Sequence, residues 1–297
     1  MSFWFYFFTF IAGLVAFNVL YKPTPKSVKG KRVLITGASS GIGKLMARKF
    51  IQMGAQVISW DYNKSEAVHK ELASIAGEES IVSYAIDVSD KDQVYELAAR
   101  VKKEVGKVDI VINNAGVVSG GNSWEVKDES IEKVMKVNTM GPMWITKAFI
   151  KDFVDADSGH LVYISSMAST LGTNKLADYC ASKWGIFGYA ESIRLELGAL
   201  GKKNVHTTIV CPYYINTGMF DGVTSIGLMM KILQPEPVVD SIVEAILTNR
   251  HELYLPAWMP YLTFLMRAFL PSYIRDMSND ILGVSKSMDQ FKGQRRV

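Results

Sequence analysis

The stretch RVLITGASSGIGKLMARKFIQMG, residues 32–54, decides the fold of this 297-residue chain. It opens with a short β-branched run typical of a buried strand, and it closes with apolar residues at helical spacing. Three glycines lie between these two segments. Gly37 permits a tight turn, Gly41 lets the backbone approach a phosphate, and Gly43 allows the helix to pack closely. The stretch therefore predicts a strand, a glycine-rich loop and a helix whose free N–H groups can bind a pyrophosphate.

Strand-like and helix-like segments alternate along the rest of the chain. After the first at 32–36, the strand-like segments are residues 56–60, 81–86, 108–112, 160–165 and 205–210. Helical patterns cover residues 42–53, 64–75, 90–105, 128–151 and 178–199. Strands that are apolar throughout and separated by helices indicate a parallel sheet covered on both faces. Right-handed crossovers then predict a doubly wound α/β fold, the Rossmann fold, in a single domain over residues 31–256.

An acidic residue ends the second strand-like segment. Asp61 follows QVISW, and a carboxylate at this point can accept hydrogen bonds from both ribose hydroxyls of an adenosine. It would repel the 2′-phosphate of NADP, and Ser39 and Ser40 add no compensating positive charge. We therefore predict NAD as the cofactor. Two alternatives stay open: Asp61 caps a turn, or the chain is an NADP-linked reductase.

The composition excludes several other classes of protein. Hydrophobic residues make up 48% and charged residues 21% of the chain, which excludes a disordered or collagen-like protein. The net charge of +4 is too small to indicate a nucleic-acid partner. Two cysteines provide no disulfide framework, and the four histidines lack the spacing of zinc ligands. We therefore predict no nucleic-acid partner and no bound metal.

The apolar excess is concentrated first at the N-terminus. Residues 1–21 contain no charged side chain and are long enough to span the hydrocarbon core of a bilayer as a helix. No basic region precedes them, which argues against a cleaved signal peptide. Residues 22–30 are basic and contain two prolines, which predicts a stiff linker on the cytoplasmic side. We predict a membrane anchor followed by a domain that faces the cytosol, with monotopic or hairpin insertion as the alternative.

A second apolar stretch covers residues 253–266. Pro256 and Pro260 argue against one straight spanning helix. We expect this stretch to lie partly in the core and partly at a substrate mouth or at a surface that dips into lipid. Residues 257–297 then form a C-terminal apolar segment and a basic tail, and we expect the tail to be solvated.

Three motifs in a fixed order carry a family resemblance. They are the G-x-x-x-G-x-G spacing of residues 37–43, the run NNAG at 113–116, and the run YCASK at 179–183. Over residues 31–256 the chain resembles the short-chain dehydrogenase/reductase family. The segments LADYCASK and TTIVCPYYINTGMF (207–220), with the anchor, are most similar to membrane-associated retinol dehydrogenases of the epidermal type and to lipid-droplet 17β-hydroxysteroid dehydrogenases.

The resemblance implies an NAD-dependent oxidoreductase with four catalytic residues. Tyr179 and Lys183 are four residues apart, so they share one face of a helix, and Lys183 would help to lower the pKa of the phenol. Tyr179 could then take the alcohol proton while a hydride leaves for the nicotinamide. Ser166 matches the serine that orients the reacting oxygen, with Ser165 ranked second. Asn138 matches the asparagine of a proton relay to the lysine.

The same resemblance implies a set of cofactor contacts. They comprise the glycine loop, an adenine-binding pair, residues near the ribose, the catalytic pair and a segment beside the nicotinamide: Gly37, Ser39, Ser40, Gly41, Ile42, Gly43, Asp61, Asp87, Val88, Asn114, Ala115, Gly116, Tyr179, Lys183, Pro212, Ile215 and Thr217. Tyr213 stands where the family usually has glycine, which changes the detailed backbone of the last segment. Asn113, Cys180 and Cys211 are interpreted as structural.

Residues 218–235 stand in the place of the family's substrate lid. The candidate substrate contacts are Ser166, Tyr179, Met219 and Phe220, and apolar surface is added by Ile226, Leu228, Met229 and Met230. An apolar lid and a membrane anchor predict a lipophilic alcohol, retinol first and a steroid or long-chain alcohol second. A catalytically silent NAD-binding protein of lipid droplets is the alternative from another class.

The resemblance also implies an assembly and a location. Helices over 128–151 and 178–199 correspond to the family's usual dimer faces, so we expect a homodimer. The anchor and the basic linker predict the endoplasmic reticulum membrane, a lipid droplet or both, with the catalytic domain in the cytosol.

Overall fold

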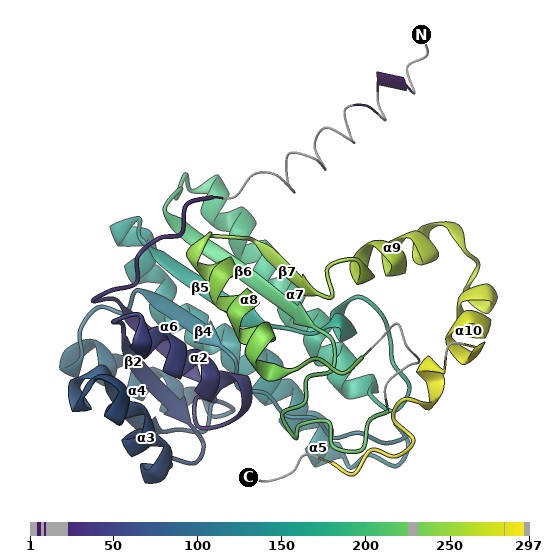
Figure 1. Cartoon of the computed structure of the whole chain (residues 1–297), viewed down its shortest axis with the longest axis horizontal. Helices are drawn as coiled ribbons and strands as arrows, with labels where there is room; N and C mark the ends of the chain where they lie inside the picture. Colours follow the sequence, from purple (N-terminus) through teal and green to yellow (C-terminus); the bar gives the residue numbers. More distant parts are fainter. Residues whose placement is uncertain (1–4, 7–8, 10–22, 225–230, 282, 294–297) are drawn as a thin grey trace.

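The computed structural model describes residues 5–6, 9, 23–224, 231–281 and 283–293 (Figure 1). The predicted anchor, residues 1–21, lies almost wholly outside these ranges, and so do lid residues 225–230. Among the helices within the described ranges, none combines the length and the apolar character needed to cross a membrane.

One parallel sheet forms the centre of the described chain. Its seven strands run in the spatial order β3-β2-β1-β4-β5-β6-β7. They are β1 (Arg32–Thr36), β2 (Gln56–Asp61), β3 (Ile81–Ala85), β4 (Ile110–Asn113), β5 (Gly159–Ile164), β6 (Val205–Pro212) and β7 (Glu252–Leu255). The order reverses between β1 and β4, which creates the crevice at which such sheets bind their ligands. The predicted doubly wound fold is confirmed.

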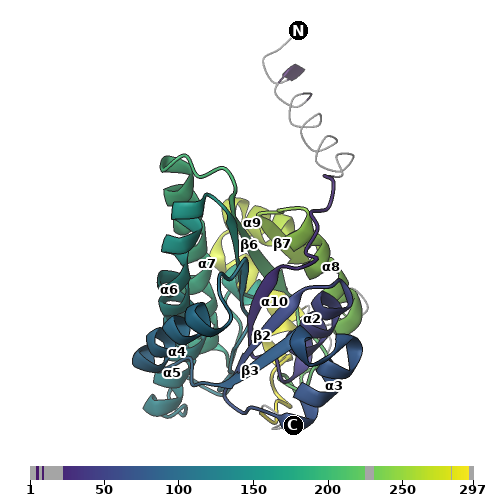
Figure 2. The same ribbon diagram turned by 90° about the vertical axis from the view of Figure 1, so that its left-hand side faces the viewer.

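Helices cover both faces of the sheet (Figures 1 and 2). One layer consists of α2 (Gly41–Gln52), α3 (Glu66–Ala76) and α8 (Pro235–Leu247), and the other of α4 (Lys91–Glu104), α6 (Gly141–Ala156) and α7 (Ala177–Ala199). Side chains of the strands alternate between the two layers. In β1, Leu34 packs into one apolar core and its neighbours Val33 and Ile35 into the other, and all three are fully buried. The strands are therefore apolar on both faces, as predicted.

The helix predicted over 128–151 is wrong in one respect. It consists of α5 (Asp128–Met135), a π-helical turn (Lys136–Met140) and α6, which continues to Ala156. The interruption coincides with a close approach, because a Cβ on Gly141 would lie 2.7 Å from the carbonyl oxygen of Val88. A π-helical turn of this kind is frequent at functional sites.

The C-terminal third contains elements that the sequence did not reveal. The stretch 253–266 divides into strand β7 and helix α9 (Met259–Phe269), and α10 (Ser272–Ile281) follows. Pro260 lies in the first turn of α9, where a missing N–H costs nothing. Figure 1 shows α9 and α10 projecting from the side of the sheet beyond β7. The prediction of a solvated tail is confirmed for Lys286 and Lys292, which are exposed, but it is wrong for Ser287 and Met288, which are only 1% exposed.

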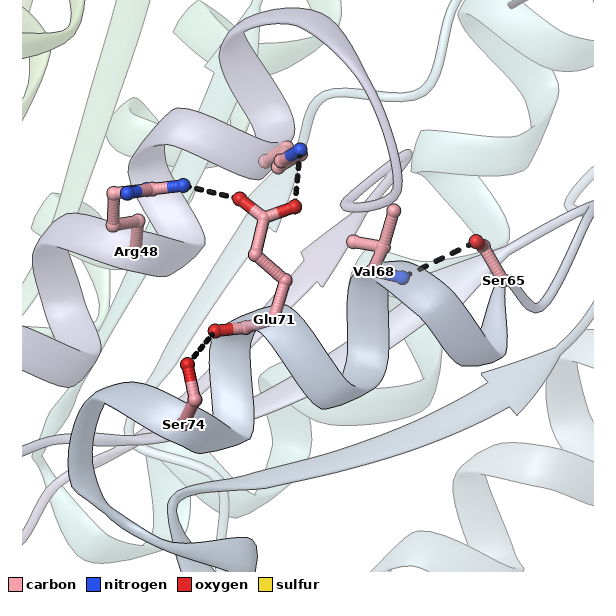
Figure 3. A network of polar contacts seen from close by, with 6 residues as sticks. Arg48, Ser65, Val68, Glu71 and Ser74 are labelled. Atoms are coloured by element: carbon pink, nitrogen blue, oxygen red, sulfur yellow. Dashed lines mark hydrogen bonds and ion pairs between the residues drawn. The ribbon is translucent and has the colours of Figure 1, made fainter.

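Ion pairs behind the glycine loop hold α2 against α3 (Figure 3). Glu71 on α3 accepts hydrogen bonds from Lys44, at 2.7 Å, and from Arg48, both on α2. Ser65 caps α3 by accepting from the Val68 N–H at 3.3 Å. The helix that follows the glycine loop is therefore fixed at two of its basic side chains.

The linker is docked on the body rather than free. Val28 is 2% exposed, and the Lys26 N–H donates to the Leu247 carbonyl at 2.8 Å. The Lys26 ammonium donates to Asn249 Oδ1 at 2.7 Å and to His160 Nδ1 at 2.7 Å. Lys26 is therefore held at the amino edge of the sheet by the buried His160 and the half-buried Asn249.

Candidate active site

A cleft of about 1240 Å³ opens where β1 to β6 end. It is lined by all the predicted catalytic, cofactor and substrate residues except Asn138: Gly37, Ser39, Ser40, Gly41, Ile42, Gly43, Asp61, Asp87, Val88, Asn114, Ala115, Gly116, Ser166, Tyr179, Lys183, Pro212, Ile215, Thr217, Met219 and Phe220. Because parallel strands end at the same edge of the sheet, residues more than 180 positions apart in the chain meet here.

The glycine loop is tightest at Gly37 and Gly43. Gly37 adopts a φ of +67°, and its N–H donates to the Trp60 carbonyl at 2.7 Å. A Cβ on Gly43 would lie 2.0 Å from the Gly37 carbonyl oxygen. The Asn114 amide donates to the carbonyls of Thr36 and Gly37, at 2.8 and 3.2 Å, and so ties β4 to the loop. The tight turn at Gly37 and the close helix packing at Gly43 are confirmed, and the phosphate approach at Gly41 stays a prediction.

The N-terminus of α2 fits an anionic group. The helix has no acidic residue in its first turn, and the Ser40 side chain makes no capping hydrogen bond to it. The N–H groups of the first turn therefore keep their capacity to donate to an anion at the positive end of the helix. Thr217 faces this point, since a Cβ on Gly41 would lie 3.5 Å from its Cβ.

Asp61, the last residue of β2, presents its carboxylate at the edge of the cleft. The Ser39 N–H donates to its Oδ2 at 2.9 Å and the Asn63 N–H donates to its Oδ1 at 3.1 Å, so both oxygens are fixed in position. Each oxygen retains capacity to accept from a ribose hydroxyl. The nearby cations Lys44 and Arg48 are already paired with Glu71. This end of the cleft therefore suits two hydroxyls better than an added phosphate.

Tyr179 and Lys183 lie at the centre of the cleft, on the first two turns of α7. Both are buried, at 4% exposure each. The Lys183 ammonium lies 5.5 Å from the centroid of the Tyr179 ring and donates to the Ile164 carbonyl at 2.9 Å. The Ser166 hydroxyl, just past β5, donates to the Pro212 carbonyl at 3.4 Å and accepts from the Ala168 N–H at 3.1 Å. Three predicted catalytic side chains thus line one cleft, with Tyr179 and Lys183 buried and Ser166 half-buried.

The pKa values of Tyr179 and Lys183 differ from the expectation that Lys183 helps to lower the pKa of the phenol. Burial raises the pKa of the Tyr179 phenol well above its usual 10, and an interaction with the Ser166 hydroxyl offsets part of that rise. Burial also lowers the pKa of Lys183 to about 8. In the protein alone, Lys183 does not bring the phenol into the neutral range. Lowering the pKa of the phenol requires further positive charge at the cofactor end of the cleft.

Two secondary assignments can be placed in the structure. The Ser165 hydroxyl donates to the Lys183 carbonyl at 3.0 Å, so it points to α7 and away from the Ser166 hydroxyl, as expected. Asn138 lies in the π-helical turn behind the cleft. Its amide donates to the Val117 carbonyl at 2.9 Å and to the Ser182 hydroxyl at 3.0 Å, and its Oδ1 accepts from the Val117 N–H at 2.8 Å. Asn138 braces the strand-end loop against α7, and its role in a proton relay stays a prediction.

The other end of the cleft is apolar. Phe220 packs edge-on against Tyr179 with ring centroids 5.5 Å apart, and Tyr214 packs against Phe220 at 4.9 Å. Helix α9 supplies a further wall through Met259, Leu262, Thr263 and Met266. Arg267 fixes this helix, because its guanidinium stacks on the Trp184 ring at 5.0 Å and donates to the Thr170 carbonyl at 2.9 Å.

Sequence reasoning missed several residues at this site. Ser182 was read only as a motif position, but its hydroxyl contacts Asn138 and donates to the Tyr179 carbonyl at 2.7 Å. Asp178 accepts from the Ser119 hydroxyl at 2.5 Å. Val284 and Ser287, from the tail, also line the cleft. For Ser182, its place next to the lysine in the YCASK motif was an available signal. Val284 and Ser287 gave no signal, because contacts between residues more than 100 positions apart leave no local sequence pattern.

Comparison with known proteins agrees with this geometry. Residues 31–225 match the profile of the short chain dehydrogenase family. The chain is 44% identical to epidermal retinol dehydrogenase 2 of Homo sapiens over 94% of this chain and 91% of that protein. It is 37% identical to retinol dehydrogenase 10 of Homo sapiens over 95% and 91% of the two chains. The crystal structure of a short chain dehydrogenase/reductase from Burkholderia phymatum in complex with NAD superposes with a TM-score of 0.73, at 24% identity over 82% of this chain and 94% of that chain.

The chain therefore belongs to the short-chain dehydrogenase family. The family resemblance carried by its three motifs is confirmed, and with it the prediction of an oxidoreductase that acts on CH–OH groups.

Proposed function

We propose that this protein transfers a hydride between NAD and a lipophilic alcohol, with retinol as the substrate that it oxidises to retinal. The observation that carries the proposal is that the buried Tyr179 lines a single cleft with two kinds of residue. One kind is the glycine loop with Asp61, and the other is a set of apolar side chains that includes Phe220 and Met259. The likeness to two retinol dehydrogenases supports the choice of alcohol.

The cofactor end of the cleft would hold NAD through four features. The first turn of α2 would bind the pyrophosphate, and Asp61 would accept from the adenosine ribose hydroxyls. Asp87 and Val88 would flank the adenine. The segment Pro212–Thr217 would lie beside the nicotinamide. When bound, NAD supplies the hydride acceptor and a positively charged ring.

The protein's own contribution is to bind, orient and deprotonate the alcohol. Ser166 would donate to or accept from the reacting oxygen and fix its position beside the Tyr179 hydroxyl. Tyr179, as phenolate, would accept the alcohol proton. Lys183 would stabilise that phenolate by its charge and would bind the ribose hydroxyls next to the nicotinamide. Asn138 would complete a path for the proton beyond Lys183.

A panel of alcohols tests the activity. All-trans-retinol, a 17β-hydroxysteroid and a long-chain primary alcohol are incubated with the full chain in detergent or membranes, with NAD or NADP. We expect NADH formation to be fastest with retinol and NAD. Faster turnover of the steroid would make the steroid, rather than retinol, the assigned substrate. NAD binding without turnover of any alcohol would favour the catalytically silent alternative.

The membrane is the proposed location of this reaction. Outside the anchor, the exposed side chains of α9 and α10 include a run of aromatic and aliphatic residues: Tyr261, Phe264, Leu265, Phe269, Tyr273, Met277 and Ile281. Residues of α9 on the other side line the cleft, so lipid and substrate pocket would share one helix. We place the protein on the endoplasmic reticulum or a lipid droplet, with the catalytic domain in the cytosol. Protease digestion of sealed microsomes tests this, because a domain protected until detergent is added would be lumenal.

A homodimer is the proposed assembly. Leu195 on α7 is 64% exposed and Met140, before α6, is 40% exposed, which leaves apolar surface on these two faces. Leu195→Glu should shift the mass measured by light scattering from dimer toward monomer. A wild-type protein that elutes as a monomer in detergent would refute the proposal.

A further inference from the structure

The end of the described chain crosses the mouth of the cleft. Residues 283–293, which we call the strap, run over the lid segment 218–224. The Thr224 N–H donates to the Ser287 carbonyl at 3.1 Å, and the Lys292 N–H donates to the Asp221 carbonyl at 2.9 Å. Asp221 and Gly293 form an antiparallel bridge. The strap therefore binds the lid through backbone hydrogen bonds at its middle and near its C-terminal end.

The strap is also attached to the loop that leads into α7. Asn174 donates to the Ser285 carbonyl at 2.9 Å, and the Lys175 ammonium pairs with Asp289 at 2.6 Å. Met288 is 1% exposed and packs in one apolar cluster with Tyr179. The strap thus joins the two segments that enclose Tyr179, the lid and the start of α7.

Two glycines make room for the strap. A Cβ on Gly222 would lie 2.0 Å from the Gln290 carbonyl oxygen, and a Cβ on Gly120 would lie 2.2 Å from Cε1 of Phe291. Both distances are shorter than any real contact of a Cβ. These positions, one in the lid and one in the loop after β4, therefore fit the strap only as glycine.

Phe291 connects the strap to the candidate acid/base. Its ring packs on Phe220 with centroids 6.4 Å apart, and Phe220 packs edge-on against Tyr179 at 5.5 Å. Phe291 itself is not part of the cleft lining, so it would act on the alcohol only through Phe220. Removal of its ring would leave Phe220 free to turn away from the space beside the Tyr179 hydroxyl.

We propose that the strap locks the lid over Tyr179 and that Phe291 is a specificity-determining residue, which holds Phe220 as the wall against which a long apolar alcohol packs. The inference rests on the proposed function for its substrate. A short alcohol needs only Ser166 and Tyr179, whereas a long one also needs the apolar wall. Loss of the wall should therefore lower kcat/KM for a long alcohol more than it lowers kcat/KM for a short alcohol.

The test compares kcat/KM for all-trans-retinol and for 1-butanol in the full-length protein. In Phe291→Ala we expect the retinol-to-butanol ratio to fall about tenfold, mainly through KM for retinol, because apolar contacts of this size discriminate by that order. Phe291→Leu, which keeps apolar volume, should restore most of the ratio, and NAD affinity should not change. A general loss of structure would lower both activities together, so an unchanged ratio in Phe291→Ala overturns the proposal.

A pair of glycine variants separates the contact from backbone strain. Gly120→Ala places a Cβ against Phe291 at a φ of +70°, whereas Gly201→Ala introduces the same strain at a φ of +69° with no atom within 4 Å. We expect Gly120→Ala to lower the retinol-to-butanol ratio and Gly201→Ala to leave it unchanged. Equal ratios in the two variants would contradict a role for the strap contact.

Hydrogen exchange gives a readout that does not need turnover. In the cofactor-free protein, Phe291→Ala should speed exchange of the lid amides Val223 and Thr224, while amides of β5 exchange as in the wild type. A wild-type protein that oxidises no alcohol would refute only the proposed function. Hydrogen exchange of the lid amides would then still test whether the strap holds the lid. Unchanged exchange of the lid amides in Phe291→Ala would refute the proposal that the strap locks the lid.

Discussion

At the residue scale, the fold buries the phenol on which the reaction would depend. Desolvation opposes the negative charge of a Tyr179 phenolate, so the free protein keeps this group protonated. The Lys183 ammonium is 5.5 Å from the ring, and its own pKa is lowered to about 8. Activation of the phenol therefore depends on charge that arrives with the cofactor, which would couple proton transfer to a loaded site.

Substitution of the phenol tests this role directly. Tyr179→Phe removes only the hydroxyl group, so NAD should bind with unchanged affinity while kcat falls by about a hundredfold to ten-thousandfold. Tyr189→Phe, the same change on the same helix but outside the cleft, is the control and should retain activity. Steady-state rates and NAD titration measure the two effects. Activity of Tyr179→Phe within a few-fold of wild type would remove it from the acid/base role.

Cofactor preference is a second property of single residues. Asp61 should make NAD the better cofactor, because its carboxylate accepts from ribose hydroxyls and repels a 2′-phosphate. Asp61→Ser with Ser40→Arg removes that repulsion and adds a cation, so the ratio of kcat/KM for NADP over NAD should rise at least tenfold. The wild-type ratio is the sharper measurement, since preference for NADP in the unchanged enzyme contradicts the assignment.

At the scale of elements, local patterns predicted the sheet and the cofactor loop, but not the far wall of the cleft. β1, the glycines and α2 are contiguous, and their 2- and 3.6-residue periods are visible in one window. The break at the π-helical turn leaves the apolar period of 128–151 almost intact, so it gave no signal. Strand β7 and helix α9 share one uncharged stretch, in which composition alone marks no boundary. The contact of Gly120 with Phe291 joins positions 171 residues apart, and no local pattern records it.

The packing of α2 on the glycine loop leads to an element-scale prediction. In Gly43→Ala the new Cβ would lie 2.0 Å from the Gly37 carbonyl, so the helix must move, at a cost of about 1–3 kcal/mol in the free energy of unfolding. NAD affinity should fall as well. Gly188→Ala, in the middle of α7 with nothing within 4 Å of the new methyl, should instead stabilise by about 0.5–1 kcal/mol. Urea unfolding of both variants measures the difference, and equal stabilities would contradict the steric reading of the loop.

At the scale of the whole molecule, the two edges of the sheet carry different chemistry. The carboxyl edge holds the cleft, and the amino edge holds a basic cluster in which the buried His160 lies with Lys26 of the linker, the half-buried His206 and the exposed His251. These histidines are distant in sequence, and parallel pairing places His160 beside His206. His160 is 1% exposed, and its Nε2 is 2.8 Å from the Thr208 hydroxyl, which itself donates to the Arg250 carbonyl. The cluster holds the segment that follows the predicted anchor against the catalytic domain.

We expect this cluster to make the stability of the protein depend on pH. Burial, with the positive charge of Lys26 and the neighbouring His206 and His251, lowers the pKa of His160 well below 6.5. Burial and Lys26 also lower the pKa of His206 to about 4, against a small opposing effect of Asp157. A histidine whose pKa is depressed on folding binds a proton more readily in the unfolded chain. Its contribution is therefore fully present above pH 6.5 and is lost as the pH falls from 6.5 toward the folded pKa.

The slope of the free energy of unfolding against pH measures how many histidines take up a proton when the chain unfolds. For His160 alone, the free energy of unfolding should fall by about 1.4 kcal/mol for each pH unit once the unfolded imidazole is charged. His160→Gln keeps an acceptor for Lys26 but cannot titrate, so its curve should lose that part of the slope between pH 6.5 and 4.5. Urea unfolding at half-unit intervals between pH 4.5 and 7 gives both curves, over a range in which Lys26, whose pKa burial lowers to about 8, stays mostly charged. Parallel curves for the two proteins below pH 6.5 would show that His160 takes up its proton equally in the folded state, and the basic cluster would then not set the acid limit of the fold.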